Sequence, residues 1–553
     1  MRRYWWALLS LLLVTAVLGV SACGGDDDSG EGGGGGDTSK GGGELKIAST
    51  GLDNADPTLY QTVQANQVFQ LVYTPLVTYN HAEGSAGTKI IPGLAEEVPE
   101  PTNGGKTYEF TLRKGLKYSD GTPVKASDFE NTMKRLLNLG SVWSSFYSGI
   151  VGAAEFQEKG DFSGDIKGIE TDDKTGKITI NLVEPDTKVL FALAEAYTSP
   201  TPAAKSPAKS LKQPPPGLGP YTLDIVDFSR EYVLTKNKSF DIPGIPKGNF
   251  DKITVEVSDS VTKMTQDVIN GQVDFMTEDP TGDQLPEVRA KYKDRYQEAP
   301  NPPNTYYFFL NHTIPPFDKL EARQAVNYAL DSRALVRIFG GRLKPGCTFL
   351  PPALVGYKDY ECAYGDPNGG PDLSKAKELV KQSGYEGEKV TVWTNNKDPR
   401  PAIADYYRDV LNQIGFEADV KTLDQQVYFE QMGLKRTKAQ TGFTDWYQDY
   451  PHPGDFIDVL LSTNSLKTEV TNNQGFVSDP ELDKKLDELR PKTPEEGADE
   501  WGDLDEYVVN DQAHVAPYGY EESSSFFSER MNAQDCAGIH PVYKNDWLLF
   551  CLK

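Results

Sequence analysis

Residues 106–129 read KTYEFTLRKGLKYSDGTPVKASDF and contain, in succession, the signals of a strand, a turn and a helix start. Thr107–Leu112 alternates polar and apolar side chains, which predicts a half-buried strand. Asp120-Gly121 favours a tight turn. Ser127, followed three residues later by Glu130, predicts a capping box at a helix start. The apolar face of that helix would consist of Phe129, Met133, Leu136 and Leu137.

The same alternation of strands and helices continues along the chain. Further strands are predicted at Lys177–Leu182, Ile253–Val257 and Lys389–Trp393. Asp318 and Glu321 predict another helix start, of the D-x-x-E type. Asp372 predicts the N-cap of a helix that ends at Gly384. Strands that alternate with helices in this way indicate an α/β fold.

Composition limits the class of protein. The 553 residues suffice for two or three domains, and 38% hydrophobic with 25% charged residues is typical of soluble globular proteins. The formal net charge is −25. A field of this sign argues against nucleic-acid binding and against a face that binds anionic lipid.

The first 22 residues predict an export signal, because Arg2 and Arg3 precede an apolar run that ends in small residues. Val20-Ser21-Ala22-Cys23 resembles the bacterial lipobox, which implies that Cys23 becomes the lipidated first residue of the mature protein. The alternatives are a plain membrane anchor and an ordinary signal peptide. Residues 23–43 then form a lipidated cysteine and a Gly/Asp-rich flexible tether.

Four cysteines remain after Cys23, and an even number in an exported protein suggests two disulfides. The sequence allows three connectivities. We predict the local pairs Cys347–Cys362 and Cys536–Cys551, which close two short loops. No pair has metal-site spacing.

Catalytic motifs are absent from the sequence or occur in the wrong order. There is no G-x-S-x-G or H-E-x-x-H, and the five histidines are scattered. S-x-x-K follows K-T-G instead of preceding it, and S-D-N is missing. We therefore predict that the chain is not an enzyme and uses no cofactor or metal.

Residues 441–455, TGFTDWYQDYPHPGD, concentrate aromatic rings and acids. Pro451 and Pro453 predict a shaped loop here rather than the middle of a helix. Ring faces attract cations, and a carboxylate can pair with them, so this stretch suits a positively charged ligand. The alternative is a packed surface corner whose acids face water.

Several stretches, all in the same order along the chain, resemble the oligopeptide/dipeptide/nickel class of ABC-importer solute-binding proteins. They are Leu94–Glu97, 106–129, Gly217–Tyr221, Tyr306–Asn311, Pro316–Asp318, Glu321–Asp331, 372–384 and Trp446–Pro453. The resemblance covers about Glu44 to Lys553. It implies an α/β fold of the periplasmic-binding-protein type II kind, in which two lobes joined by hinge crossings close on a ligand and a third domain is inserted.

The resemblance also implies domain boundaries. The first lobe would comprise 44–77, 203–300 and 516–553, the inserted domain 78–202 and the second lobe 301–515. Pro-rich runs near residues 199–216 and 300–303 fit such boundaries, since proline stops helices and stiffens crossings.

Site residues follow from the resemblance. In peptide-type members an aspartate three residues after the tryptophan of the ligand loop holds the ligand's amino terminus. The resemblance therefore implies that role for Asp449, which follows Trp446 at this spacing. Those members often carry an arginine where this chain has Phe443, so recognition of a free carboxylate is in doubt; Lys435 and Arg436 could substitute or be solvated surface charges. The other expected wall residues, which could equally be core, are Trp446, Tyr447, Tyr450, Gln64, Ala65, Asn66, Trp143, Tyr147, Tyr518 and Tyr520.

Together these features predict a monomeric, lipid-anchored, extracytoplasmic protein that captures a peptide or other amine-bearing solute and delivers it to an ABC permease. It would contact the membrane only through its lipid, on the outer face of the cell membrane or in a periplasm. Polyamine-like cations and sugars remain possible ligands, whereas nickel is disfavoured because no histidine or cysteine cluster exists. The alternative function is a surface receptor of the same fold used in peptide signalling or adhesion.

Overall fold

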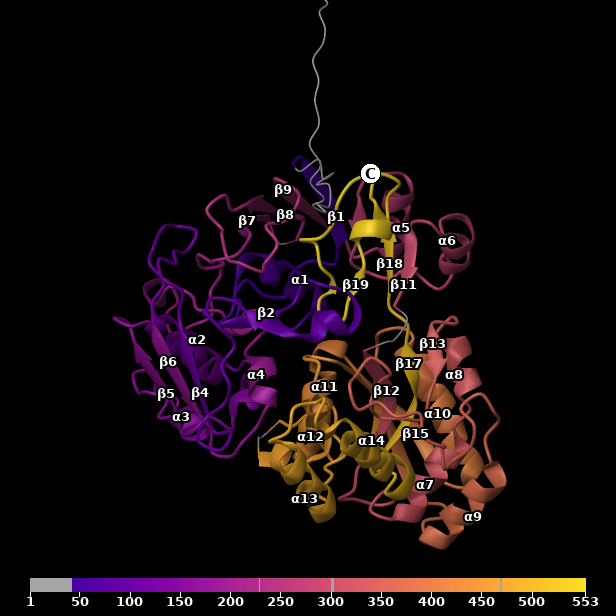
Figure 1. Ribbon diagram of the computed structural model, residues 1–553. Helices are drawn as coiled ribbons and strands as arrows, with labels where there is room; N and C mark the ends of the chain where they lie inside the picture. Colours follow the sequence, from indigo (N-terminus) through magenta and orange to yellow (C-terminus); the bar gives the residue numbers. More distant parts are fainter. Residues whose placement is uncertain (1–41, 228, 300–302, 468–469) are drawn as a thin grey trace, which may run out of the picture. The chain divides into compact units, whose positions relative to one another are not determined.

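The computed structural model describes residues 42–553 except 228, 300–302 and 468–469. The predictions made for residues 1–22, for Cys23 and for most of the tether therefore lie outside the described residues. Lys40–Lys553 forms one compact unit (Figure 1).

A seven-stranded sheet forms the first lobe. Its strand order is β11 (Tyr296–Glu298), β18 (Ser524–Phe527), β10 (Phe275–Met276), β1 (Glu44–Ser49), β9 (Lys252–Val257), β8 (Glu231–Lys236) and β7 (Tyr221–Asp227). The strand β1 pairs in parallel with β9 and β10, and the remaining pairs are antiparallel. The helices of this lobe are α1 (Val63–Val72), α5 (Val261–Ile269), α6 (Leu285–Lys291) and the short α15 (Ala533–Cys536). The predicted strand at Ile253–Val257 is confirmed.

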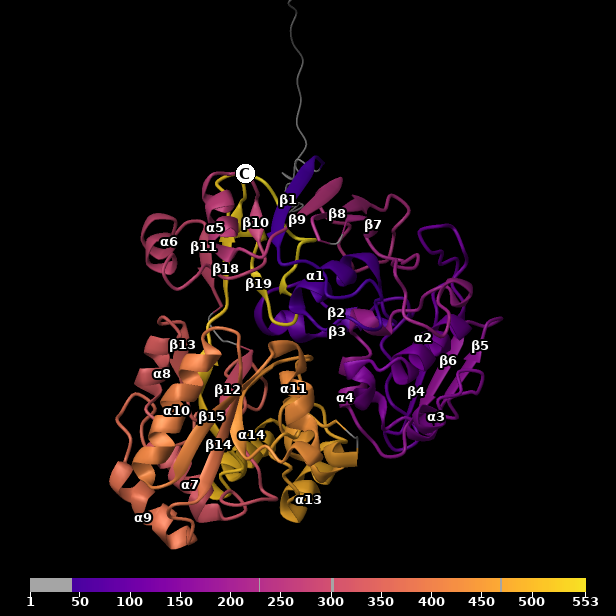
Figure 2. The ribbon, with the colours of Figure 1, turned by 180° about the vertical axis from the view of Figure 1, so that it is seen from behind.

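A six-stranded sheet forms the second lobe. Its order is β13 (Leu343–Pro345), β17 (Val515–Glu521), β12 (Asn304–Leu310), β16 (Thr441–Tyr447), β14 (Lys389–Asn395) and β15 (Glu417–Leu423). Its helices are α7 (Leu320–Ala329), α8 (Ser332–Ile338), α9 (Leu373–Ser383), α10 (Arg400–Ile414), α11 (Gln425–Gly433), α12 (Ile457–Leu461), α13 (Pro480–Leu489) and α14 (Ala498–Glu506). Figure 2 shows α10 beside β14 and β15. Every residue of β12 is buried, as expected for a strand covered on both faces.

The chain passes from the second lobe to the first between β17 and β18. Because β17 pairs with β12 and β13, residues up to Glu521 belong to the second lobe's sheet. The predicted boundary at residue 516 is therefore several residues too early. No local sequence signal shows which sheet this strand joins.

The inserted domain contains the antiparallel sheet β4 (Thr107–Thr111), β6 (Lys177–Asn181) and β5 (Ile169–Asp172), with α2 (Ala126–Asn138), α3 (Ala153–Lys159) and α4 (Lys188–Ala192). The pair β2 (Val77–Tyr79) and β3 (Ile90–Pro92) precedes it, and the two-stranded β19 (Ile539–His540) and β20 (Lys544–Asn545) lies near the C-terminus. One continuous apolar core joins the inserted domain to the first lobe and also includes Tyr450 of the second lobe. The rest of the second lobe packs around two large cores of its own. The molecule therefore has two bodies that pack mostly around separate cores.

The predicted helix starts differ in their capping residues. The helix α2 begins at Ala126, and the Lys125 N–H donates to Asp128 Oδ2 at 3.0 Å. The predicted Ser127–Glu130 capping box is thus wrong, because Ser127 lies inside the helix and hydrogen-bonds Asp173 instead.

For the other two predicted helix starts, one predicted cap is absent and one is confirmed. The helix α7 begins at Leu320, and Asp318 does not cap it; its carboxylate accepts from the Tyr385 hydroxyl at 3.1 Å. The predicted cap at Asp372 is confirmed, since it accepts from the Lys375 N–H at 2.9 Å. The predicted end at Gly384 is confirmed as well, where φ of 80° suits glycine.

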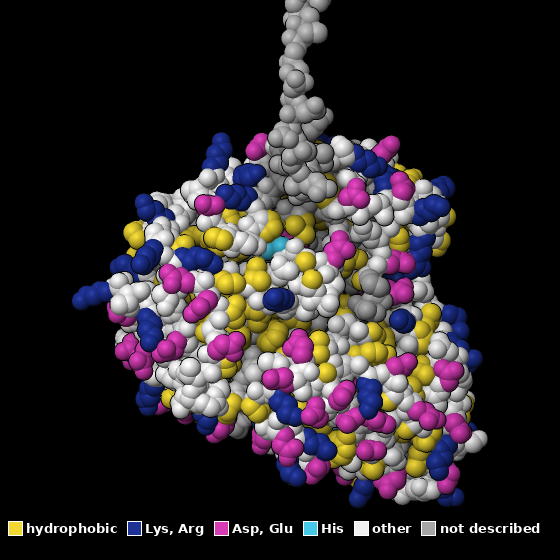
Figure 3. Space-filling model, in the orientation of Figure 1, with side chains coloured by type: hydrophobic (Ala, Val, Ile, Leu, Met, Phe, Trp, Pro, Cys, Tyr) yellow, Lys and Arg dark blue, Asp and Glu magenta, His cyan; other side chains and the backbone are white. Residues whose placement is uncertain are grey.

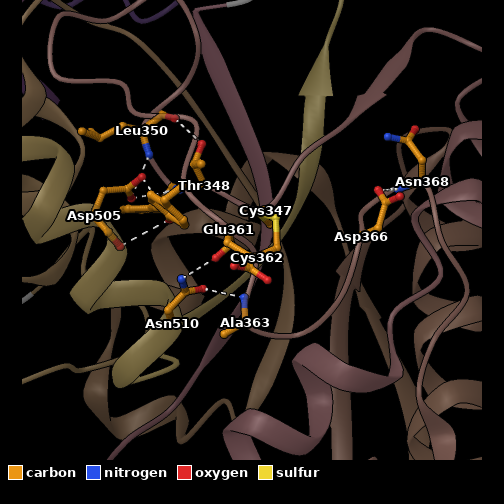
Figure 4. The surroundings of a disulfide bond; sticks show 12 residues. Cys347, Thr348, Leu350, Glu361, Cys362, Ala363, Asp366, Asn368, Asp505 and Asn510 are labelled. Atoms are coloured by element: carbon orange, nitrogen blue, oxygen red, sulfur yellow. Dashed lines mark hydrogen bonds between the residues drawn. A yellow bond between two sulfur atoms is a disulfide. The ribbon is translucent and has the colours of Figure 1, made fainter.

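Both expected disulfides, Cys347–Cys362 and Cys536–Cys551, are present. Figure 4 shows the first of them beside two polar anchors. Asp505 accepts from the N–H groups of Phe349 and Leu350 at 3.0 and 3.1 Å. Asn510 accepts from the Ala363 N–H and donates to the Glu361 carbonyl. The loop is therefore fixed to α14 and the residues after it by hydrogen bonds as well as by the covalent bond.

Candidate ligand-binding site

A cavity of about 1750 Å³ is lined by residues of both lobes. It exceeds the roughly 300–1,000 Å³ of pockets for drug-sized ligands, so it has room for a longer molecule. The first lobe contributes Glu278, Asp279 and Lys544, among others. The second lobe contributes Tyr306, Arg400, Phe443, Asp445, Tyr447 and Glu521, among others. Over the outer surface, acidic and basic side chains are interspersed (Figure 3).

The second-lobe wall of the cavity is a network of charged and aromatic groups. Glu521 accepts from the hydroxyls of Tyr306 and Tyr447, the latter at 2.8 Å, and pairs with Arg342 at 2.9 Å. The Glu521 carboxylate therefore already has three partners within the protein. A ligand would meet a fixed wall here rather than a free acid.

Arg400 is a cavity residue that the sequence interpretation missed. It lies at the start of α10, 3.4 Å from Asp445, with its guanidinium 4.6 Å from the centre of the Phe443 ring. A cation therefore stands beside Phe443, the position where an arginine was expected by resemblance. Lys435 and Arg436 are exposed and do not line the cavity. No sequence pattern identifies Arg400 as a cavity residue, because α10 reaches β16 only in the folded structure.

The aromatic and acidic stretch 441–455 is only partly a loop. Residues Thr441–Tyr447 form β16, which pairs with β12 throughout its length, and Pro453–Asp455 forms a 3₁₀ helix. The loop prediction was wrong for 441–447, because the two prolines act only on the residues that follow Gln448.

Asp449 lies in this loop, between cavity-lining Gln448 and Pro451; the residue is half-buried, and its Oδ2 is buried. Its N–H donates to Asp455 Oδ2 at 2.9 Å, and the Trp446 indole donates to the same oxygen at 3.3 Å. Asp449 Oδ2 has no hydrogen-bond partner, and no described Lys, Arg or His pairs with it. Burial raises the pKa of Asp449 to about 8 and that of Asp455 well above its usual range. Among the described residues, no cation therefore pairs with Asp449.

A second buried acid near Asp449, Glu195, also escaped the sequence interpretation. It belongs to the inserted domain and is 2% exposed. Asn66 donates to its Oε2 at 3.5 Å, and the Tyr60 hydroxyl in turn donates to Asn66 Oδ1 at 2.8 Å. A single Glu in a loop carries no signal that would distinguish it from a solvated charge.

The sequence-predicted wall residues fall into three groups. Gln64 and Tyr447 line the cavity, and Gln64 donates to Glu278 at 2.6 Å. Asn66, Trp143, Trp446 and Tyr450 surround the buried acids, as shown by contacts with Glu195, Tyr197, Asp455 and Phe146. Ala65, Tyr147, Tyr518 and Tyr520 pack in cores and do not line the cavity.

The described residues contain no group of three or more His, Cys, Asp or Glu side chains arranged to hold a metal ion. Within the same part of the chain, no helix has the length and apolar character needed to cross a membrane.

Two lobes, an inserted domain and a large interlobe cavity define a solute-binding protein. Residues 89–467 match the family described as bacterial extracellular solute-binding proteins, family 5 Middle. This match covers more than half of the chain, and the chain belongs to that family. It is therefore an extracytoplasmic solute-binding protein and not an enzyme.

Individual relatives agree with this assignment. The oligopeptide-binding protein OppA of Bacillus subtilis is 24% identical over 478 residues, 82% of this chain and 83% of the relative. The glutathione-binding protein GsiB of Escherichia coli O1:K1 is 26% identical over 393 residues, 69% of this chain and 71% of the relative. Among solved structures, the clavulanic acid biosynthesis oligopeptide binding protein 2 has the same fold, with a TM-score of 0.83 and 23% identity over 93% of this chain and 96% of that one.

Proposed function

We propose that this chain is a lipid-anchored receptor that captures peptides by closure of its lobes and delivers them to an ABC permease. The observation that carries the proposal is Asp449, a buried carboxylate without a cation, next to a cavity of about 1750 Å³. Burying a charge without a partner is costly, so a ligand ammonium is the natural partner. Two relatives whose names state peptide ligands, an oligopeptide and glutathione, support this ligand class.

The opposite end of a peptide would meet Arg400. Its guanidinium lies on the cavity wall and offers donors in the planar arrangement that a carboxylate accepts. A ligand carboxylate would compete with Asp445, which lies 3.4 Å from Arg400 and is a loose partner. Peptides with free termini at both ends therefore fit the site better than polyamines or sugars.

Thermal unfolding of residues 40–553, the compact unit, against di- to hexapeptides, polyamines and oligosaccharides tests the proposal. A ligand at 100 times its Kd should stabilise the fold by about 2.7 kcal/mol. We expect peptides to raise the Tm, and Asp449→Ala to abolish the shift. A shift with sugars that survives Asp449→Ala would contradict amine capture. No shift with any compound would favour the receptor alternative.

Arg400→Gln provides the second arm of the experiment, with Arg408→Gln on the same helix as its control. Arg408 pairs with Asp405 and Asp409 and does not line the cavity. We expect Arg400→Gln to weaken the binding of peptides with a free C-terminal carboxylate but not the binding of C-terminally amidated peptides. Equal weakening of both would show that Arg400 acts through packing alone.

A further inference from the structure

Glu195 is buried without a cation on the side of the inserted domain. Its Oε1 has no hydrogen-bond partner, and among the described residues no Lys, Arg or His pairs with either of its oxygens. In the described part of the chain, the one donor to Oε2 is the Asn66 amide, at a long 3.5 Å. A carboxylate in this condition needs a partner that the described part of the protein does not supply.

Asp449 and Glu195 come from different bodies and are connected by a chain of ring contacts. Phe146 lies 5.2 Å from Tyr450, which follows Asp449, and 5.9 Å from Trp143. Trp143 in turn stacks on Tyr197, two residues from Glu195. Burial raises the pKa of Glu195 well above its usual range, and the charge on Asp449 adds to this. The two acids thus lie on opposite sides of the seam between the inserted domain and the second lobe.

The rings along this connection belong to both bodies. Trp143 stacks on Tyr197 with ring centres 5.0 Å apart, and Tyr60 lies 5.9 Å from Tyr197. Across the seam, Phe146 of the inserted domain meets Tyr450 of the second lobe edge to face at 5.2 Å. Ring faces of this kind favour ammonium and guanidinium groups.

We propose that Glu195 is a second ligand-binding carboxylate and that the seam selects ligands whose amino end carries two positive charges. Asp449 would hold the α-ammonium and Glu195 a second cation within one side-chain length of it. Two buried carboxylates that face a single ammonium leave one charge unpaired, and that acid has to keep a proton. A doubly charged amino end pairs both acids.

The ligand class that follows is a peptide with a basic first residue. The inference rests on the proposed function, since it assumes that Asp449 receives the peptide's amino terminus. It adds a specificity that Asp449 alone does not provide, because one carboxylate cannot distinguish a lysine-first peptide from an alanine-first one.

Isothermal titration of the detergent-solubilised full chain with Lys-Ala-Ala and Ala-Ala-Lys tests this selectivity. The two peptides have the same composition and net charge and differ only in the position of the basic side chain. One additional charge-assisted hydrogen bond predicts about tenfold tighter binding of Lys-Ala-Ala. We expect Glu195→Gln to reduce the ratio of the two affinities to within about twofold. Glu170→Gln, at an exposed glutamate of the same domain, should keep the tenfold ratio.

Equal affinity of the unaltered chain for both peptides would overturn the inference and leave peptide capture intact, without any need for a variant. A preference for Lys-Ala-Ala that persists in Glu195→Gln would overturn the inference as well. So would a Glu195→Gln variant whose affinity for the two peptides falls by the same factor. Absence of binding to either peptide would instead contradict the proposed function, and the inference would fall with it.

Discussion

At the scale of single residues, Asp449 shows how ligand binding and folding make opposite demands on one carboxylate. Its Oδ2 is buried without a partner among the described residues, which disfavours the ionised form when no ligand is bound. A ligand ammonium would reverse this preference, since it pairs with the ionised form. Ligand binding and deprotonation of Asp449 are therefore linked.

The linkage predicts a pH dependence of stability. Because burial raises the pKa of Asp449 to about 8, above the value of about 3.9 in an unfolded chain, the folded protein keeps a proton that the unfolded chain has released. The stability contribution of this proton is complete below about pH 4 and is lost as the pH rises through 8. Asp449→Asn should flatten this decline. Urea unfolding at pH 6 and pH 8.5 measures it, and equal declines in both proteins would contradict the assignment.

The same residue predicts that amine binding strengthens as the pH rises from 6 to 8. Over this range a growing fraction of the ligand-free protein has Asp449 ionised, so ligand binding requires the release of fewer protons from Asp449. Titration calorimetry with a short peptide measures the trend, and an N-acetylated peptide, which has no ammonium, is the control. An affinity that is independent of pH for the free amine would contradict the prediction.

At the scale of elements, a charged contact connects α4 of the inserted domain to the second lobe. Lys188 contacts Asp458 of α12, and Arg490 pairs with Asp458 through two hydrogen bonds of 3.0 and 2.8 Å. Thr187, next to Lys188, donates to the carbonyl oxygens of Arg490 and Lys492. These groups belong to the two bodies, so the contacts exist only while the bodies meet.

Lys188→Met should therefore weaken ligand binding without touching the ligand. Asp458 keeps both hydrogen bonds from Arg490, so we expect the fold to survive. The lost contact with Asp458 exists only while the two bodies meet, whereas the pair of Lys188 with Asp186 lies within the inserted domain. We therefore expect affinity to fall about three- to tenfold, through faster dissociation. Lys159→Met is the matched control, since Lys159 pairs with Glu155 inside its own helix. Equal effects of the two substitutions would exclude a role of the seam.

The two disulfide loops permit another comparison between elements. Each joins cysteines separated by 15 residues. Loop-closure entropy alone predicts that Cys347→Ser with Cys362→Ser, and Cys536→Ser with Cys551→Ser, each lower the free energy of unfolding by about 3 kcal/mol. Hydrogen bonds hold both loops after the disulfides are removed, since Asp505 accepts from Phe349 of the first loop and Asn545 of the second loop donates to Ser525. We therefore expect each loss to be about 3 kcal/mol or less. Urea unfolding measures both, and a loss well above this value for either pair would contradict this reasoning.

At the scale of the whole molecule, the arrangement of the cores determines which parts can move together. The inserted domain shares one apolar core with the first lobe, whereas the second lobe packs mostly on its own. Separating the inserted domain from the first lobe would expose that core. Separating the two bodies at the seam would break polar contacts such as Lys188 with Asp458 and a few ring contacts such as Phe146 with Tyr450. Closure on a ligand should therefore move two bodies rather than three.

Membrane attachment is also a property of the whole molecule. If Cys23 is lipidated, the full chain should partition into the detergent phase of a Triton X-114 separation, and Cys23→Ser should move it into the aqueous phase. Peptide affinity should stay the same, because residues 40–553 form the compact unit that contains the cavity. A Cys23→Ser chain that still enters the detergent phase would favour an uncleaved membrane anchor.

Much of this protein could be predicted from local sequence signals. The strand at Ile253–Val257, the Asp372 cap and the Gly384 helix end depend on neighbouring residues only. Hydrophobic periodicity, capping and turn chemistry act over a few residues, so these features could be predicted. The family and the role expected for Asp449 came instead from the resemblance of several stretches to known proteins.

Only the tertiary structure decided what lies beside Asp449. Glu195 is more than 250 residues away in the chain and belongs to the other body, while Arg400 stands next to Phe443 from a different element. The place of β17 in the second sheet was likewise decided by its hydrogen-bonding partners. Burial and long-range pairing determine whether an acid is solvated or is buried without a cationic partner. Neither can be read from the spacing of nearby residues.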